Sequence, residues 1–214
     1  ALACLRNATP ANGWRLNGIT KFPPGIALFI GPVTIDGVAS SQGTLYNTIL
    51  STGGVTLTGK EHGPPVAPNF ASPLSSLCDG PFYPANLCKK SATTPSELAT
   101  WVDAKGVTHA GLPLANLAIG TNGGLSANSW DASKGNGITG NVLLGKSIST
   151  GGATISIAGS LTVGANEPSS TTITQGGLKL DTTNLTPDRG YLPGGSCTSA
   201  ATPQPVAMKW SRYL

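Results

Sequence analysis

The chain has 214 residues, of which 39% are apolar, so it can bury a sizeable core and is not a disordered chain. Charged residues make up only 10%, against about a quarter in ordinary soluble domains, whereas the 29 glycines and 17 prolines are in surplus. This composition predicts a turn-rich β protein with an uncharged polar surface, which is common outside the cell. The formal net charge is +4, but the basic residues are scattered along the sequence, which argues against nucleic-acid binding.

Four cysteines occur, at Cys4, Cys78, Cys88 and Cys197. Their even number, the lack of any CxxC motif and the low charge favour disulfides in an oxidising compartment. Three connectivities are open. The short loop between Cys78 and Cys88 contains two prolines and a glycine, so we predict a local bridge there, and Cys4 then pairs with Cys197 by elimination. The alternative is four free thiols in a cytosolic protein.

The N-terminal residues "ALA" resemble the small-residue remainder of a signal-peptide cleavage site. We therefore expect a mature, exported chain that is extracellular or at the cell surface. The longest apolar run, residues 25–33, is too short to cross a bilayer, so no membrane span is expected in this chain.

The first predicted elements are strands. The continuous apolar run at 25–33 predicts a buried strand, and the alternation of Val33 and Ile35 predicts a half-buried one after it. Residues 43–50, "GTLYNTIL", fit either a strand buried on both faces or a helical turn. The next stretch, "STGGVTLTG" at 51–59, predicts a hairpin turn at its two glycines and a strand with one apolar face.

Residues 61–84 contain six prolines and have no period, so they predict a long surface loop pinned by the disulfide. The strongest helix signal follows, in "TTPSELATWVDAKG". Thr94 and Glu97 form a capping box around Pro95, an apolar stripe includes Trp101, and Gly106 ends the segment. This pattern predicts a helix over about 95–104.

From residue 138 onward the sequence alternates in short strands separated by glycine, asparagine and serine. Such spacing suggests a meander, a sandwich or a small solenoid, but the repeats are too irregular to define a solenoid period. The phrase "STGGATISIAG" at 149–159 repeats that of 51–59, and the alternation at 206–210 predicts a last strand. The residues expected to point inward are Ile138, Val142, Leu144, Ile148, Ile155, Ile157, Leu161, Val163, Ile173, Leu178 and Leu180.

The fold class expected from these elements is mainly β, an antiparallel sandwich or meander with one short helix. We expect one domain over 1–214, with a soft division near 107–135 between an N-terminal α+β part and a C-terminal all-β part.

Candidate binding residues are few. Trp130, beside Asn128 and Asp131, could stack on a sugar ring, although a satellite cluster under a loop is the competing interpretation for this tryptophan. Two sequons, at Asn7 and Asn184, allow glycosylation.

The titratable residues form no recognisable motif. The two histidines, His62 and His109, lie in Gly/Pro-rich surroundings and are interpreted as loop residues without a role. Asp181 and Asp188 could together hold calcium, but no EF-hand pattern supports such a site. No metal, cofactor or catalytic residue is predicted.

Low charge, Thr- and Ser-rich strands and disulfides favour a non-enzymatic structural subunit of an extracellular assembly, such as a pilus, a filament or a surface layer. A secreted carbohydrate-binding adhesin domain and a secreted glycoside-active hydrolase are the alternatives. With its "GGVTLTG" phrase at 53–59 and Cys197 near its end, the β-rich half resembles the globular domains of bacterial type IV pilins and minor pilins. The resemblance implies that copies of the chain pack together, whereas glycans are the partners expected under the adhesin alternative. Those pilins begin with an apolar helix that this chain lacks, so the helix would be removed or lie on a small partner chain.

Overall fold

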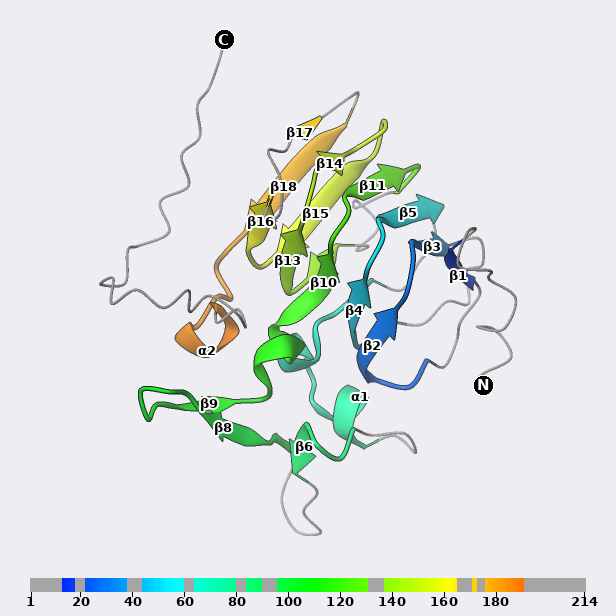
Figure 1. Ribbon diagram of the computed structural model, residues 1–214. Coiled ribbons are helices and arrows are strands. Elements are labelled where there is room, and N and C mark those ends of the chain that lie inside the picture. The colour runs from blue at the N-terminus through cyan, green and yellow to red at the C-terminus, as the bar shows by residue number, and fades with distance from the viewer. Residues whose placement is uncertain are drawn as a thin grey trace.

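The computed structural model describes residues 13–17, 22–37, 44–59, 64–79, 84–89, 96–130, 137–164, 171–172 and 176–190. In these residues the strands wind into a parallel β-solenoid of about five turns (Figure 1). Strands one turn apart lie side by side and hydrogen bond in parallel. The prediction of an antiparallel sandwich or meander is therefore wrong. Alternation shows that one face of a strand is buried, but it does not show the direction of the neighbouring strand.

Three parallel sheets form the walls of the solenoid. The five-stranded sheet contains, in spatial order, β16 (Leu161–Val163), β13 (Asn141–Leu144), β10 (Leu117–Thr121), β4 (Asn47–Ser51) and β2 (Gly25–Phe29). The six-stranded sheet contains β1 (Trp14–Asn17), β3 (Val33–Gly37), β5 (Val55–Gly59), β11 (Leu125–Asn128), β14 (Ile148–Ser149) and β17 (Thr171–Thr172). The three-stranded sheet contains β12 (Ile138–Thr139), β15 (Thr154–Ala158) and β18 (Gly177–Asp181). From β10 to β18 the chain visits the five-, six- and three-stranded sheets in that order, three times.

The length of a turn varies along the solenoid. Gly25 pairs with Asn47, 22 residues later (47 − 25), and Val142 pairs with Leu161, 19 residues later (161 − 142). Between them, β4 and β10 pair across a long insertion, with Ile49 opposite Ile119. Because the spacing changes from turn to turn, the sequence shows no fixed period.

The interior is built from stacked side chains of successive turns. In the six-stranded sheet, Val33 pairs with Val55, Val55 with Leu125, and Leu125 with Ile148. Each of these four side chains is at most 1% exposed. Burying one such side chain contributes about 1.5–3 kcal/mol, so these stacks account for much of the stability of the solenoid.

Glycine pairs mark corners of the coil. Gly53 and Gly54 connect β4 to β5, which belong to different sheets, so the predicted hairpin turn at this place is wrong. The repeated phrase at 149–159 makes another corner, between β14 and β15. Gly123 lies directly against Gly54 of the preceding turn and donates its N–H to the carbonyl of Gly53 at 3.1 Å. Two turns approach this closely because neither residue carries a side chain.

The apolar run at 25–33 is buried on one face only, which corrects the prediction of a fully buried strand. In β2 the end residues Gly25 and Phe29 are buried, but Leu28 is 65% exposed. Ile26 and Ile30 are also exposed, at 42% and 59%. The inward face of β2 meets the core, whereas its outward face carries apolar side chains that no described element covers.

A long insertion between Val66 and Leu117 interrupts the solenoid. Its regular elements are η2 (Pro68–Phe70), α1 (Ser75–Cys78), β6 (Cys88–Lys89), β7 (Glu97–Leu98), β8 (Thr100–Val102), β9 (Thr108–Ala110) and η3 (Pro113–Asn116). The predicted disulfide Cys78–Cys88 is confirmed and joins α1 to β6. Residues 65–71 are buried, so this part of the predicted surface loop instead packs against the solenoid. None of the helices in the described part of the chain is long and apolar enough to cross a membrane.

The helix predicted at 95–104 is also wrong. The segment forms β7 and β8, and β8 pairs in antiparallel register with β9. Gly106 has a φ of +81° and lies in the turn of this hairpin. Thr100–Val102 are β-branched or aromatic and pair well across a hairpin, and these cross-strand contacts outweigh the local capping signal. The expected cap at residues 94–95 lies outside the described residues.

Candidate functional site

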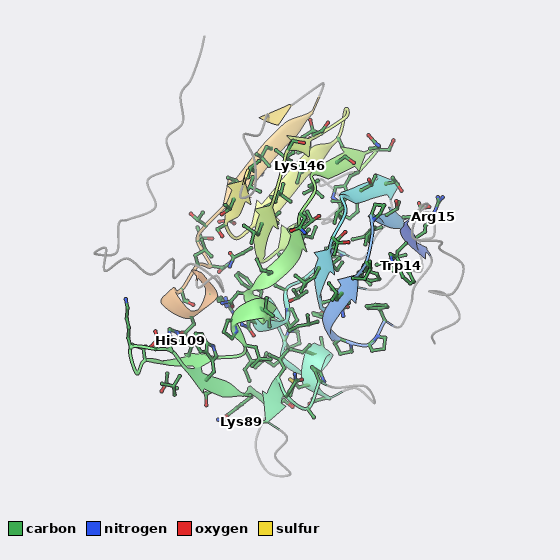
Figure 2. All side chains as sticks on the ribbon, viewed as in Figure 1. Trp14, Arg15, Lys89, His109 and Lys146 are labelled. Carbon is green, nitrogen blue, oxygen red and sulfur yellow. A yellow bond between two sulfur atoms is a disulfide. The ribbon has the colours of Figure 1, made fainter. Side chains whose placement is uncertain are left out.

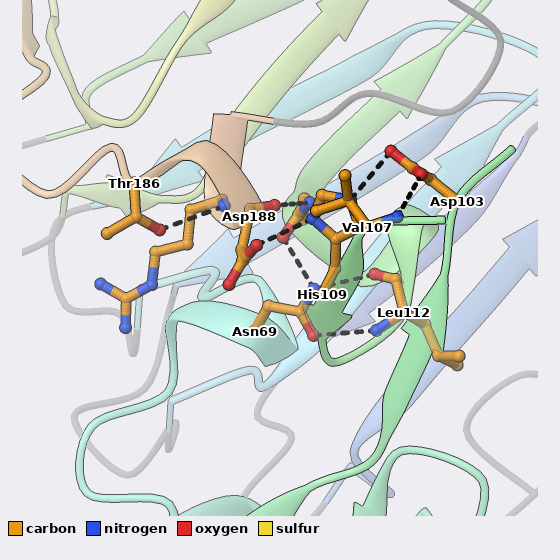
Figure 3. A network of polar contacts seen from close by, with 9 residues as sticks. Asn69, Asp103, Val107, His109, Leu112, Thr186 and Asp188 are labelled. Carbon is orange, nitrogen blue, oxygen red and sulfur yellow. Dashed lines mark hydrogen bonds and ion pairs between the residues drawn. The ribbon is translucent and has the colours of Figure 1, made fainter. Parts of the chain in front are cut away.

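A polar network joins the C-terminal part of the described chain to the insertion. After β18 the chain leaves the stack of turns and forms α2 (Pro187–Gly190), which lies beside β9 (Figures 1 and 3). We call residues 182–190 the return segment. It brings Asp188 to His109, although 79 residues separate the two in the sequence.

His109 forms the centre of this network (Figure 3). Its Nδ1 lies 2.8 Å from Oδ1 of Asp188, and its Nε2 lies 3.1 Å from Oδ2 of Asp103. The imidazole also stacks on Trp101, with ring centroids 4.6 Å apart and planes inclined by 21°. The side chain of His109 is 8% exposed. A doubly protonated ring can donate one N–H to each carboxylate, and we name this arrangement the His109 bridge.

The surroundings of the bridge favour the ionised form of Asp103 and the protonated form of His109. The hydrogen bond from the Val107 N–H to Oδ1 of Asp103, at 2.9 Å, is the largest cause that lowers the pKa of Asp103. The bond to His109 and that from the Lys105 N–H act in the same direction. The hydrogen bond to Asp103 is the largest cause that raises the pKa of His109, and Asp188 adds to it, while desolvation opposes both.

Two buried asparagines hold the backbone of the return segment. Asn116 donates from Nδ2 to the carbonyl of Asp188 at 2.7 Å, and Asn141 donates to the carbonyl of Arg189 at 2.6 Å. Asn116 accepts in turn from Nδ2 of Asn69 at 2.7 Å. Asn116 ends the insertion directly before β10 and Asn141 begins β13, which pairs with β10, so these bonds tie the return segment to the side of the solenoid.

The His109 bridge links β9 to the return segment. Each ring nitrogen of His109 lies at hydrogen-bond distance from a carboxylate, that of Asp103 beside β8 or that of Asp188 in α2. Among the described residues, no group of three or more His, Cys, Asp and Glu side chains is arranged to hold a metal ion. Of the two acids considered for calcium, Asp181 accepts bonds from Thr183 and Asp188 faces His109, so each carboxylate has its own partner in the protein.

No local sequence pattern indicates the His109 bridge. The interpretation of His109 as a loop residue without a role is wrong, because it lies in β9 and pairs with two carboxylates. Alternation at 100–102 and 108–110 around a glycine could have indicated the hairpin, but no local pattern indicates that Asp188 returns to it. His62 lies outside the described residues.

The predicted binding residues are placed apart from this network. Trp130 is 2% exposed and belongs to the main core, whereas the competing interpretation placed it in a satellite cluster under a loop. Asn128 and Asn184 are exposed. The remaining predicted residues, Asp131, Asn7, Cys4 and Cys197, lie outside the described residues.

The described basic residues are dispersed over the molecule. Arg15, Lys89 and Lys146 lie at widely separated places in Figure 2. Arg15 is paired, with its Nε 2.7 Å from Oδ2 of the buried Asp36. The structure thus gathers none of these three cations with another, in agreement with their scattered order in the sequence.

A groove opens on the outward face of the five-stranded sheet. One row across this sheet consists of Leu28, Leu50, Gly120 and Leu143, which are paired strand to strand. Gly120 has no side chain, and the end of the Leu50 side chain lies over it, since a Cβ there would be 2.9 Å from Cδ2 of Leu50. The resulting groove has a volume of about 280 Å³, and Leu114 and Leu117 close one side of it. We call this region the apolar groove.

No protein-family model, curated protein or solved structure matches this chain. The resemblance to type IV pilins is wrong, because the "GGVTLTG" phrase at 53–59 that carried it is a corner and a strand of a parallel solenoid.

Proposed function

We propose that this chain is a non-enzymatic structural subunit of an extracellular assembly, and that two copies associate through the apolar groove and the neighbouring outward face of β2. The observation that carries the proposal is the exposure of Ile26, Leu28 and Ile30 on that face, at 42%, 65% and 59%. Contiguous exposed apolar side chains of this kind are unusual on a monomer and are typical of interaction surfaces.

The shape of the surface favours a second copy of the same chain as the partner. Leu28 of β2 is exposed and also lines the apolar groove, so one face offers both a ridge and a groove. Two copies related by a two-fold axis can each place the ridge in the groove of the other. None of the described residues that line the groove is charged, so the contact brings no like charges together.

The disulfide supports an extracellular location for this assembly. A bond such as Cys78–Cys88 persists in oxidising compartments and is rare in the cytosol. The parallel ladders of the solenoid also supply a stiff scaffold on which such a surface can be presented.

The test is the molar mass of the purified chain, measured by light scattering and sedimentation over a wide range of concentrations. Wild type should show a reversible, concentration-dependent dimer. Leu28→Ser removes apolar burial from both copies of a two-fold contact and should weaken the dimer about tenfold or more. Val102→Ser is the matched control, because Val102 is 62% exposed but lies on β8, away from the groove.

A second variant distinguishes docking in the groove from general stickiness. Gly120→Ala adds apolar surface but changes the shape of the groove, because its new methyl group displaces the flexible end of Leu50 and touches that of Leu117. A fitted contact should be weakened by this change, whereas non-specific association should persist or increase. A wild-type chain that stays monomeric throughout, or an equal effect of Leu28→Ser and Val102→Ser, contradicts the proposal.

A further inference from the structure

A second concave surface lies between the solenoid and the return segment. Its volume is about 430 Å³, within the range of small-molecule sites. Its floor includes Val66 and Phe70, and Val66 bridges to Thr139 of the next turn. The polar side chains around it are Thr44, Tyr46, Ser72, Thr139, Asn184 and Arg189. We call this region the Arg189 cleft.

Arg189 is the only charged residue among the described lining residues of the cleft. Its Cζ lies over the Phe70 ring, 5.1 Å from the ring centroid, a cation–π contact that helps to hold the guanidinium in place. Its backbone is fixed independently, because its carbonyl accepts from Asn141 and its N–H donates to Oγ1 of Thr186 at 3.3 Å. In the described part of the chain the guanidinium has no hydrogen bond and no ion pair.

A guanidinium held in this way keeps its N–H edge free for an oxyanion. Carboxylate and sulfate groups accept two parallel N–H bonds from arginine, and none of the described lining residues is acidic and able to compete. One pole of the ligand should therefore be an anionic group.

The rest of the lining selects a polyhydroxylated ligand. Thr44, Ser72 and Thr139 present hydroxyl groups that both donate and accept, and Asn184 presents an amide. The half-buried ring of Tyr46 offers a flat apolar surface of the kind on which a sugar ring can pack. A small anion would leave most of a 430 Å³ cleft unfilled.

We propose that the Arg189 cleft binds an acidic saccharide, with the carboxylate or sulfate of one sugar residue on the guanidinium of Arg189 and its hydroxyl groups on the surrounding side chains. This site is separate from the apolar groove, so it does not depend on self-association of the chain.

Calorimetric titration of the full chain tests the site. The protein should come from a host that adds no N-linked glycan, so that Asn184 is unmodified. The probes are an oligouronate, a sulfated oligosaccharide, a neutral oligosaccharide of the same length, and inorganic sulfate. At least one acidic oligosaccharide should bind about tenfold or more tightly than the neutral one. Binding of the oligouronate identifies the anionic group as a carboxylate, and binding of the sulfated oligosaccharide identifies it as a sulfate.

Three variants assign the binding to the cleft. Arg189→Gln should weaken binding about tenfold or more, since it removes a charged hydrogen-bond donor. Lys179→Gln removes the same charge from an exposed position on β18 and should leave binding unchanged. Thr139→Val keeps the charge and the shape of the cleft but removes a hydroxyl. It should therefore weaken binding of the acidic oligosaccharide and leave binding of inorganic sulfate unchanged. Thermal unfolding of each variant shows whether the fold is intact.

Several outcomes overturn the proposal. If wild type binds neither acidic oligosaccharide, the Arg189 cleft is not a site for an acidic saccharide. Equal losses in Arg189→Gln and Lys179→Gln indicate general charge attraction. Inorganic sulfate that binds as tightly as the oligosaccharides indicates an anion site without sugar recognition.

Discussion

Replacing Gly123 with alanine should destabilise the solenoid, because this residue lies in close contact with the backbone of the preceding turn at a corner. A Cβ on Gly123 would lie 2.7 Å from both Cα and N of Gly54, and 2.8 Å from the carbonyl carbon of Gly53. All three are backbone atoms, so no side chain can rotate away. Ordinary contact begins at 3.4 Å, and the two corners must separate by about 0.7 Å, against a strand spacing of about 4.8 Å.

Overpacking of this size costs about 1–3 kcal/mol, and stretching the bond from the Gly123 N–H to the Gly53 carbonyl adds to it. We expect a loss of about 2–3 kcal/mol in the free energy of unfolding. For a chain of this length, each kcal/mol lowers Tm by roughly 2–4 °C, so Tm should fall by roughly 4–12 °C. Calorimetry and urea titration measure both quantities, and the urea m-value should not change.

Gly177→Ala is the matched control. Gly177 does not have a left-handed φ, and the nearest atoms to its Cβ are those of the Thr154 side chain at 3.8 Å, which is an ordinary contact. Alanine should therefore be neutral there or stabilise by about 0.4–1 kcal/mol through the unfolded chain. If Gly123→Ala has the same Tm as wild type, or if Gly123→Ala and Gly177→Ala change the Tm equally, the close stacking of the two corners is refuted.

Three further predictions concern the bridge, the core and the disulfide. Asp103 raises the pKa of His109 above 6.5, so the His109 bridge stabilises the fold fully below about pH 6.5 and loses this contribution as the pH rises through the raised pKa. Between pH 6 and 9, the Tm of wild type should therefore fall more than the Tm of His109→Gln. Parallel Tm profiles of the two proteins would contradict this. Leu125→Ala should cost about 2–5 kcal/mol in urea titration, since the side chain is 1% exposed, and a loss under about 1 kcal/mol would mean that the site is not buried. The double variant Cys78→Ser/Cys88→Ser should lose about 3 kcal/mol in the chain-entropy account of a loop with separation 10, and an unchanged Tm would show that the bridge is not needed.

Much of the strand content could be predicted from the sequence. A period of two depends only on which side of a strand is buried, so alternation located the inward residues. Leu161, Val163, Leu178 and Leu180 are half-buried against the core, and Ile173 lies outside the described residues. Those predicted inward and found fully buried are Ile138, Val142, Leu144, Ile148, Ile155 and Ile157.

Local sequence patterns gave wrong predictions at two places where tertiary contacts decide the secondary structure. The capping pattern before Trp101 is a genuine helix-start pattern, yet the hairpin with His109 provides both a stacked ring and cross-strand hydrogen bonds. Likewise, the Gly53–Gly54 pair suits a hairpin and a solenoid corner equally well, since both need a backbone without side chains. Only the partner strand distinguishes the two.

The sequence by itself therefore determined the β class, the inward faces of the later strands and the local disulfide, because these depend on alternation or on residues close together in the chain. The tertiary structure alone decided the parallel winding, the exposure of Leu28, the His109 bridge and the two concave surfaces. These features require segments from 19 to 79 residues apart to meet. No local pattern specifies such meetings, because turns of unequal length leave the register to be chosen by packing between whole turns.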